Sequence, residues 1–222
     1  MSNGTVNIGM IGVGDMGARH AVNFSRHVAG ASVVALMDKD EARLAKMATE
    51  CAGSRTFADG QALIADASVD AVVIAAPDAF HAELVQACLD AGKPVLCEKP
   101  LATNASDAEA IFRREVELGR TLVQVGFMRE YDQAHQDLKA ALADVGSPLL
   151  FRGFHYNPSK GVARHIDDVI TNSAIHDIHS AHWLVGEEIV EVYTRHIPTP
   201  WIDTRPAGSW CSISLSEAAR WG

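Results

Sequence analysis

The stretch VNIGMIGVGDMG, residues 6–17, joins a short apolar run to three glycines, Gly12, Gly14 and Gly17. The run predicts a strand and the residues after the turn predict a helix, so the glycines connect the two elements. Gly12 would allow a tight turn, Gly14 would let the backbone approach a pyrophosphate, and Gly17 would let the helix pack closely on the strand. The stretch therefore predicts the first strand–turn–helix of a dinucleotide-binding sheet.

An acid follows the second apolar run, as this kind of site requires. Asp38 comes directly after SVVALM, residues 32–37. A carboxylate there can accept both ribose hydroxyls and repels a 2′-phosphate, so NAD is favoured over NADP. Lys39 could turn toward such a phosphate and leaves NADP open as an alternative. The backbone N–H groups of Asp15 and Met16, at the helix N-terminus, are expected to bind the pyrophosphate.

Apolar runs alternate with helix-like stretches along the first half of the chain. Runs that are apolar on both faces and joined by helices are typical of a parallel sheet covered on both sides. Residues 1–127 are therefore predicted to form an α/β domain with a doubly wound, Rossmann-type parallel sheet. The expected strands are 6–11, 32–37, 71–76, 94–97, 121–125 and a weaker 55–57, with helices near 15–28, 40–51, 59–66, 79–91 and 104–118.

The pattern changes after Gly126, and residues 128–222 are predicted to form a separate α+β domain. The tail, residues 198–222, shows little strand alternation beyond WCSISL, so this second domain is expected to be incomplete. The expected elements are a helix at about 131–145, a strand at 148–156, a helix at 170–185 and a strand at 188–197.

Composition narrows the class of partner. A hydrophobic content of 48% with 21% charged residues is ordinary for a globular chain of 222 residues. The net charge of −9, without a basic cluster, argues against nucleic acid, and no apolar run reaches the length of a membrane span. Four scattered cysteines without a CxxC pair indicate a reduced, cytoplasmic protein. A small molecule or another protein remains as the partner.

The stretch VLCEKPLATN, residues 95–104, places two charges directly after a buried strand. In an open α/β sheet this carboxyl edge is where ligands bind, so Glu98 and Lys99 are expected to line a pocket beside the nicotinamide. The Lys99 ammonium can hydrogen-bond a substrate hydroxyl and stabilise the alkoxide that develops as hydride leaves. The alternative is a surface lysine in a loop. Pro100 fixes the backbone direction after it.

Two more residues at the same edge are grouped with the cofactor-binding set. Pro77 ends the strand predicted at 71–76, and His81 lies in the first turn of the following helix. For His81, packing or hydrogen bonding is favoured over proton transfer.

The helix predicted at 170–185 carries polar residues along one side. At 100° per residue, Asn172, His176, His179 and Trp183 form a stripe opposite the apolar face. Three interpretations remain open: a solvated face, a metal site, or a catalytic face on which a histidine takes a hydroxyl proton. Zinc is disfavoured because His182 lies off the stripe and no carboxylate joins it, so no metal is expected.

Three stretches resemble the glucose–fructose oxidoreductase/inositol dehydrogenase/rhizopine-catabolism (Gfo/Idh/MocA) family, in the right order. They are AAPDAFHAELVQACLDAGKPVLCEKPLATN (75–104), VGFMREYD (125–132) and ITNSAIHDIHSAHWLVGEEI (170–189). The resemblance covers residues 6 to about 197 and is strongest to inositol 2-dehydrogenases and related cyclitol or sugar dehydrogenases. It implies a Rossmann domain followed by an α/β domain whose large open sheet carries substrate and subunit contacts.

The resemblance also implies roles for individual residues. His176 matches the catalytic base of the family, and Lys99, Arg129 and Asn172 would bind or position the substrate with it. Two positions depart from the inositol dehydrogenases: Asn172 stands where they usually have an aspartate, and His179 stands where the family usually has an acid. Asparagine can orient a hydroxyl but cannot relay a proton.

The expected activity is NAD-dependent oxidation of a secondary alcohol of a cyclitol or sugar, similar to myo-inositol, to a ketone. The family's sheet continues beyond Ile197, so the chain is expected to be truncated or altered in frame after this residue. The family implies a homo-oligomer, often a tetramer, and the short second domain argues against one here. Two alternatives stay open: an inactive NAD-binding relative and a redox-assisted glycosidase.

Overall fold

Six parallel strands form the sheet that contains the glycine turn. The computed structural model describes residues 4–146, 148, 150–155, 170–194 and 213–214, and the chain divides into two compact units between Gly126 and Phe127. The sheet lies in the first unit, in the order β3-β2-β1-β4-β5-β6. Its strands are β1 (Val6–Ile11), β2 (Ala31–Met37), β3 (Arg55–Phe57), β4 (Ala71–Ile74), β5 (Val95–Cys97) and β6 (Val123–Val125).

This strand order places the binding edge. The chain starts in the middle of the sheet at β1, moves outward to β3, and returns to the other side of β1 at β4. All five neighbouring pairs are parallel. The loops after β1 and β4 therefore diverge at the carboxyl edge, which is where sheets of this type form their ligand crevice. The predicted doubly wound sheet is confirmed.

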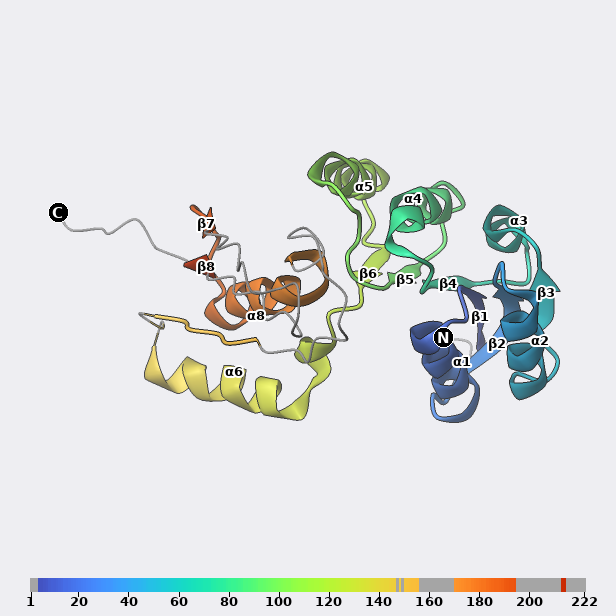
Figure 1. Ribbon diagram of the computed structural model, residues 1–222, viewed down its shortest axis with the longest axis horizontal. Helices are drawn as coiled ribbons and strands as arrows, with labels where there is room; N and C mark the ends of the chain where they lie inside the picture. The colour runs from blue at the N-terminus through green and yellow to red at the C-terminus, as the bar shows by residue number, and fades with distance from the viewer. Residues whose placement is uncertain (1–3, 147, 149, 156–169, 195–212, 215–222) are drawn as a thin grey trace, which may run out of the picture. The chain divides into compact units, whose positions relative to one another are not determined.

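Helices cover both faces of the sheet, as Figure 1 shows for the blue-to-green part of the chain. One face packs against α1 and α2, with Met10, Leu36 and Met47 among its buried residues. The other packs against α3, α4 and α5 and buries the larger cluster, which includes Ile74 and Leu89. The helices are α1 (Asp15–Arg26), α2 (Glu41–Glu50), α3 (Gly60–Ala65), α4 (His81–Asp90) and α5 (Ala105–Leu118), with a short 3₁₀ turn η1 (Asp78–Phe80) before α4.

Side chains fix where several helices begin. The carboxylates of Asp40 and Asp59 and the amide oxygen of Asn104 each accept a backbone N–H from the first turn of α2, α3 and α5. These caps satisfy N–H groups that have no partner within a helix. At the other end, α5 stops at Gly119, whose φ of 61° is left-handed.

The glycine turn tolerates no side chain at two of its positions. Gly12 has a φ of +85°, and a Cβ there would lie 2.6 Å from the backbone of Ala75 and Ala76. A Cβ on Gly17 would lie 1.9 Å from the carbonyl oxygen of Gly12. Gly14 differs, because the nearest heavy atom to a Cβ there is Arg43 Nη1 at 3.4 Å. Gly12 and Gly17 are needed for packing, whereas Gly14 leaves room above the turn.

The second unit is mostly helical where it is described. After the 3₁₀ turn η2 (Met128–Tyr131) come α6 (Gln133–Val145), the π-helical segment η3 (Ile170–Ala174) and α8 (Ile175–Val185). Two residues of β7 (Tyr193–Thr194) pair antiparallel with β8 (Ile213–Ser214). Among the described helices, none combines the length and the apolar character that a bilayer crossing requires.

Three sequence predictions for this unit are contradicted or lie partly outside the described residues. The strand predicted at 148–156 is wrong for residues 148 and 150–155, which are not in a strand. The strand predicted at 188–197 is reduced to Tyr193 and Thr194, with 195–197 outside the described residues. A stretch of alternating apolar and polar residues forms a strand only where a neighbouring strand pairs with its backbone. Here β8 pairs with only two residues of β7. Of the tail at 198–222, only β8 is described.

A pair of glycine substitutions should separate packing from ligand space. Gly17→Ala should lower the free energy of unfolding by about 1–3 kcal/mol, because its methyl group would meet the Gly12 carbonyl and push α1 off the sheet. Gly14→Ala should leave the thermal midpoint close to that of the wild type. Thermal unfolding followed by circular dichroism measures both, and equal midpoints for the two variants would contradict this packing argument.

Candidate functional site

Asp38 joins the glycine turn to the end of β2. Its Oδ2 accepts the backbone N–H of Val13 at 2.8 Å, and its Oδ1 accepts the N–H of Asp40 at 2.8 Å. The half-buried carboxylate is therefore fixed at both oxygens beside the turn. Each carboxylate oxygen can accept more than one hydrogen bond, so the ribose hydroxyls of a dinucleotide could still be bound here.

The N-terminus of α1 has the properties of a phosphate site. Gly14 is its N-cap, and no side chain makes a capping hydrogen bond there. The first intrahelical bond runs from the Ala18 N–H to the Gly14 carbonyl at 2.8 Å, so the N–H groups of Asp15, Met16 and Gly17 precede it. Uncapped N–H groups at the positive end of a helix dipole suit an anion. With no Cβ on Gly14, a pyrophosphate fits this end of the helix.

The Lys39 side chain contacts an aromatic ring. The exposed ammonium lies 4.8 Å from the centre of the Phe80 ring, which stands at the end of η1. Arg43, the other cation near the glycine turn, donates from Nε to Asp40 Oδ2 at 2.9 Å. Arg43 also interacts electrostatically with the Asp38 carboxylate, whose negative charge helps to raise the pKa of the guanidinium.

His81 connects the loop after β4 to the loop after β5 at the carboxyl edge. Its Nδ1 lies 2.6 Å from the Pro100 carbonyl oxygen, and its Nε2 lies 2.8 Å from that of Ala76. The side chain is 1% exposed, so it acts on the edge through these two carbonyls. A direct contact of His81 with a cofactor stays a prediction. Pro77 follows Ala76 in the loop after β4 as the residue before η1, and its carbonyl accepts the Phe80 N–H at 2.9 Å.

Glu98 and Lys99 follow β5 directly, and Glu98 lies in a tightly bounded position. Its Oε1 is 2.8 Å from His20 Nε2, and its Oε2 accepts the backbone N–H of Lys99 at 3.3 Å. Burial raises the pKa of the Glu98 carboxyl, but the hydrogen bond and charge of His20 and the N–H and charge of Lys99 lower it by more. The pKa therefore lies below its usual value, and Glu98 is a carboxylate at neutral pH.

In the second unit, Arg129 holds α8. Its Nη1 donates to Asp177 Oδ1 at 2.7 Å, to Ser180 Oγ at 3.1 Å and to the His176 carbonyl at 3.1 Å. Asp177 also contacts His155 through Oδ2 and Nδ1, at 2.9 Å. Asp177 thus forms an ion pair with Arg129. A substrate contact of Arg129 stays a prediction.

His179 is held by an aromatic ring and an acid. Its imidazole stacks on Phe127 with ring centroids 3.8 Å apart, and its Nε2 lies 2.9 Å from Glu130 Oε1. Burial lowers the pKa of His179, and the charges of His182 and Arg129 lower it further. Glu130 raises it by less, so the pKa lies below its usual value. Glu130 thus places a carboxylate beside His179.

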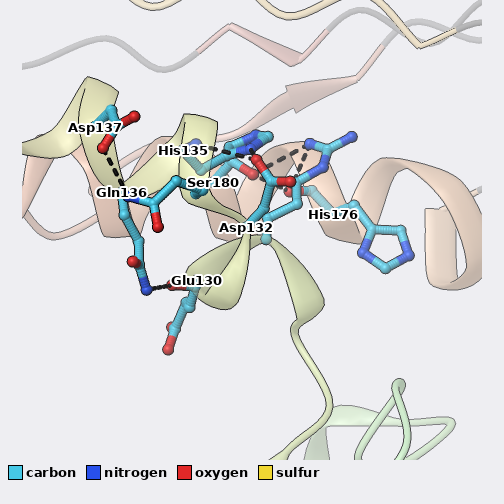
Figure 2. Close-up of polar contacts among 9 residues, drawn as sticks. Glu130, Asp132, His135, Gln136, Asp137, His176 and Ser180 are labelled. Carbon is cyan, nitrogen blue, oxygen red and sulfur yellow. Dashed lines mark hydrogen bonds and ion pairs between the residues drawn. The ribbon is translucent and has the colours of Figure 1, made fainter.

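His176 and Asn172 come from two different kinds of helix. His176 lies in the first turn of α8, and in Figure 2 its ring points away from Ser180 and Asp132. Asn172 lies in the π-helical segment, where each residue turns by less than 100°. The angle between Asn172 and His176 around the helix axis therefore differs from the one expected at 100° per residue. Both side chains are half-buried. Trp183, further along α8, lies under the Lys139 ammonium, 4.1 Å from the ring centre.

The candidate residues fall into two groups, one in each unit. The carboxyl edge of the sheet brings together the glycine turn, Asp38, Pro77, His81, Glu98 and Lys99, whereas Arg129, Asn172 and His176 belong to the second unit. Sequence reasoning missed His20 and Glu130. His20 lies three residues after Gly17, but its partner Glu98 is 78 positions away and no local signal links the two residues. Among the described residues, no group of three or more His, Cys, Asp or Glu could hold a metal ion.

Comparison with known proteins agrees with this geometry. Residues 6–127 match the model of a family described as the Gfo/Idh/MocA oxidoreductase family with an NAD-binding Rossmann fold. The chain is 49% identical over 196 residues to the inositol 2-dehydrogenase of Rubrobacter xylanophilus and 45% identical over 196 residues to inositol 2-dehydrogenase 2 of Saccharopolyspora erythraea. These matches cover 87% of this chain but 56% and 58% of the relatives, so the chain spans little more than half of their length.

Solved structures give the same likeness. The myo-inositol dehydrogenase of Lactobacillus casei, in complex with NAD(H) and myo-inositol, superposes with a TM-score of 0.82 at 32% identity, covering 89% of this chain and 59% of that one. The scyllo-inositol dehydrogenase of the same organism, with NAD(H) and scyllo-inositol, gives a TM-score of 0.80 at 27% identity, covering 90% of this chain and 62% of that one.

The tie between Arg129 and α8 can be tested by hydrogen exchange. Arg129→Met should speed amide exchange in residues 175–185 by about tenfold or more, because the half-buried Asp177 and the buried Ser180 lose a charged donor. Exchange in β1 and β4 should not change. Arg113→Met, which removes an exposed pair with Glu109, serves as the control. Unchanged protection of α8 in the Arg129 variant would show that other contacts hold the helix.

Proposed function

The chain belongs to the Gfo/Idh/MocA oxidoreductase family with an NAD-binding Rossmann fold, and we propose that it carries out NAD-dependent oxidation of a cyclitol or sugar. The reaction would convert a secondary alcohol, as in myo-inositol, to a ketone. One observation carries the proposal: Asp38 is fixed beside the glycine turn, and Lys99 follows β5 at the same edge of the sheet. An acceptor for ribose and a cation for a reacting oxygen therefore share one edge.

The cofactor is proposed from the chemistry of the chain's own groups. NAD, when bound, would accept the hydride. The uncapped N–H groups of α1 would bind its pyrophosphate, and Gly14 would let the backbone come close. Asp38 would accept the adenosine ribose hydroxyls and would repel a 2′-phosphate. Lys39 follows Asp38 in the chain and Arg43 interacts electrostatically with its carboxylate, so NADP remains the competing cofactor.

The chemical roles follow from charge and position. Lys99 would bind the substrate hydroxyl and stabilise negative charge on its oxygen as the C–H bond breaks. His176 would take the hydroxyl proton as the general base, a role that histidine performs near neutral pH. Asn172 would orient a neighbouring hydroxyl. Arg129 would contribute through α8, because it binds the His176 carbonyl and fixes the first turn of that helix.

The substrate class rests on the relatives. Both curated relatives are inositol 2-dehydrogenases, and the two solved structures hold myo-inositol and scyllo-inositol. Ring polyols with adjacent secondary hydroxyls are therefore the proposed substrates. A cytoplasmic location, predicted from the cysteines, and a homo-oligomer, implied by the family resemblance, both stay predictions.

Turnover measurements test the proposal. The wild-type chain should reduce NAD in the presence of myo-inositol, followed by NADH absorbance. Lys99→Met and His176→Gln should each lower kcat by about a hundredfold or more, as expected for a lost charge stabiliser or general base. Lys93→Met is the matched control, because Lys93 precedes β5 and donates to the Asp66 carbonyl away from the carboxyl edge.

The same assay separates the alternatives. NAD binding without reduction, across a panel of cyclitols and sugars, would favour a non-catalytic NAD-binding relative. Release of a chromophoric aglycone from a glycoside, at constant total NAD, would favour a redox-assisted glycosidase. Normal turnover in the His176 variant would remove His176 as the general base.

A further inference from the structure

The partner of Glu98 comes from the first helix of the fold. His20 lies in α1, three residues after Gly17, and its Nε2 is 2.8 Å from Glu98 Oε1. The two residues are 78 positions apart in the chain. Their side chains are 24% and 15% exposed, so the pair is largely screened from water. Hydrogen bonds to a charged group in such surroundings are stronger than those at an open surface.

The charge of Glu98 fixes the direction of this hydrogen bond. Because the pKa of Glu98 lies below its usual value, the carboxylate is ionised and can only accept. His20 must therefore carry a hydrogen on Nε2 and donate it to Oε1. The other oxygen, Oε2, accepts the N–H of Lys99, so both ends of the carboxylate have a donor.

A third element closes the position of Glu98. Gly126 follows β6, and its N–H donates to the Cys97 carbonyl at 2.7 Å. A Cβ on Gly126 would lie 3.2 Å from both Cδ and Oε2 of Glu98 and 3.3 Å from its Cα. The glycine thus leaves just enough room for the carboxylate. His20, Gly126 and the Lys99 N–H confine Glu98 from α1, from the end of β6 and from its own loop.

We propose that His20 is a positioning residue for the nicotinamide end of the cofactor site. It fixes the Glu98 carboxylate as an ionised acceptor at the carboxyl edge and, through the Lys99 N–H, fixes the backbone that carries the Lys99 side chain. This inference rests on the proposed function. It links two motifs that are far apart in sequence: the helix that binds pyrophosphate and the loop that carries the reactive lysine.

Two ligands separate this role from a structural one. ADP ends at the pyrophosphate and should need the glycine turn and Asp38 but not Glu98, whereas NAD extends to the nicotinamide. Replacing His20 by leucine should therefore weaken NAD binding by about tenfold, the effect of removing one hydrogen bond to a charged group, and leave ADP binding unchanged. His20→Gln, whose amide nitrogen can donate from a similar position, should restore most of the NAD affinity.

The control and the contrary outcomes are defined by the same titrations, carried out by calorimetry. Arg26→Gln removes another ion pair of α1, with Glu50, and should bind both ligands as the wild type does. Parallel loss of ADP and NAD in His20→Leu would show that His20 merely supports α1 and would overturn the proposal. So would unchanged NAD binding in that variant. Failure of the wild type to bind either ligand would instead count against the proposed function.

The pairing of His20 with Glu98 can also be measured without any ligand. In the ligand-free chain, the imidazole ¹⁵N resonances of His20 should show a hydrogen on Nε2. Glu98→Gln should shift these resonances, because the charged acceptor is replaced by a neutral amide. Resonances of His135, which pairs with Asp132 in the second unit, provide the internal control. His20 resonances that do not respond to Glu98→Gln would overturn the pairing.

Discussion

The hydrogen bond from the Val13 N–H to Asp38 Oδ2 is the contact on which the carboxyl edge depends. It ties the turn after β1 to the residue after β2, and the Gly12 N–H reinforces the tie by donating to the Met37 carbonyl at 2.8 Å. Together they fix the turn, and the turn sets where α1 begins. Because α1 packs against the Gly12 carbonyl at Gly17, the next turn of the helix places His20 against Glu98. The adenosine and nicotinamide ends of the proposed site are therefore positioned by one helix.

Polar and charged side chains also fix the backbone in the second unit. Arg129, Asp177 and His155 form a set in which Asp177 uses both oxygens, one for each cationic or polar partner. Glu130 and Phe127 hold His179 in the same unit. All of these contacts act on α8 or on the η2 turn that precedes α6, so they fix the backbone of His176 without using its ring. These contacts therefore set the position of the His176 backbone at the start of α8.

Much of the first unit could be predicted from sequence, because its signals are local. A few neighbouring residues are enough to recognise each of its features: the apolar runs, the glycine turn, Asp38, and the loop at Glu98 and Lys99. The pairing of His20 with Glu98 could not be read in this way, since it depends on the strand order that brings the residue after β5 within reach of α1. In the second unit, the strands expected at 148–156 and 188–197 were mostly wrong, because alternation does not reveal whether a neighbouring strand is present. A helical wheel drawn at 100° per residue also cannot show the π-helical segment before His176.

Cofactor discrimination tests the central claim most directly, because it depends on the Asp38 carboxylate. Dissociation constants for NAD and NADP should be measured by fluorescence titration for the wild type, Asp38→Ala and Lys39→Met. We expect the wild type to bind NAD at least about tenfold more tightly than NADP, since a 2′-phosphate would meet like charge. The Asp38 variant should lose this preference, and the Lys39 variant should keep it. Equal affinities in the wild type, or a preference that survives in Asp38→Ala, would contradict the claim that this carboxylate organises the site.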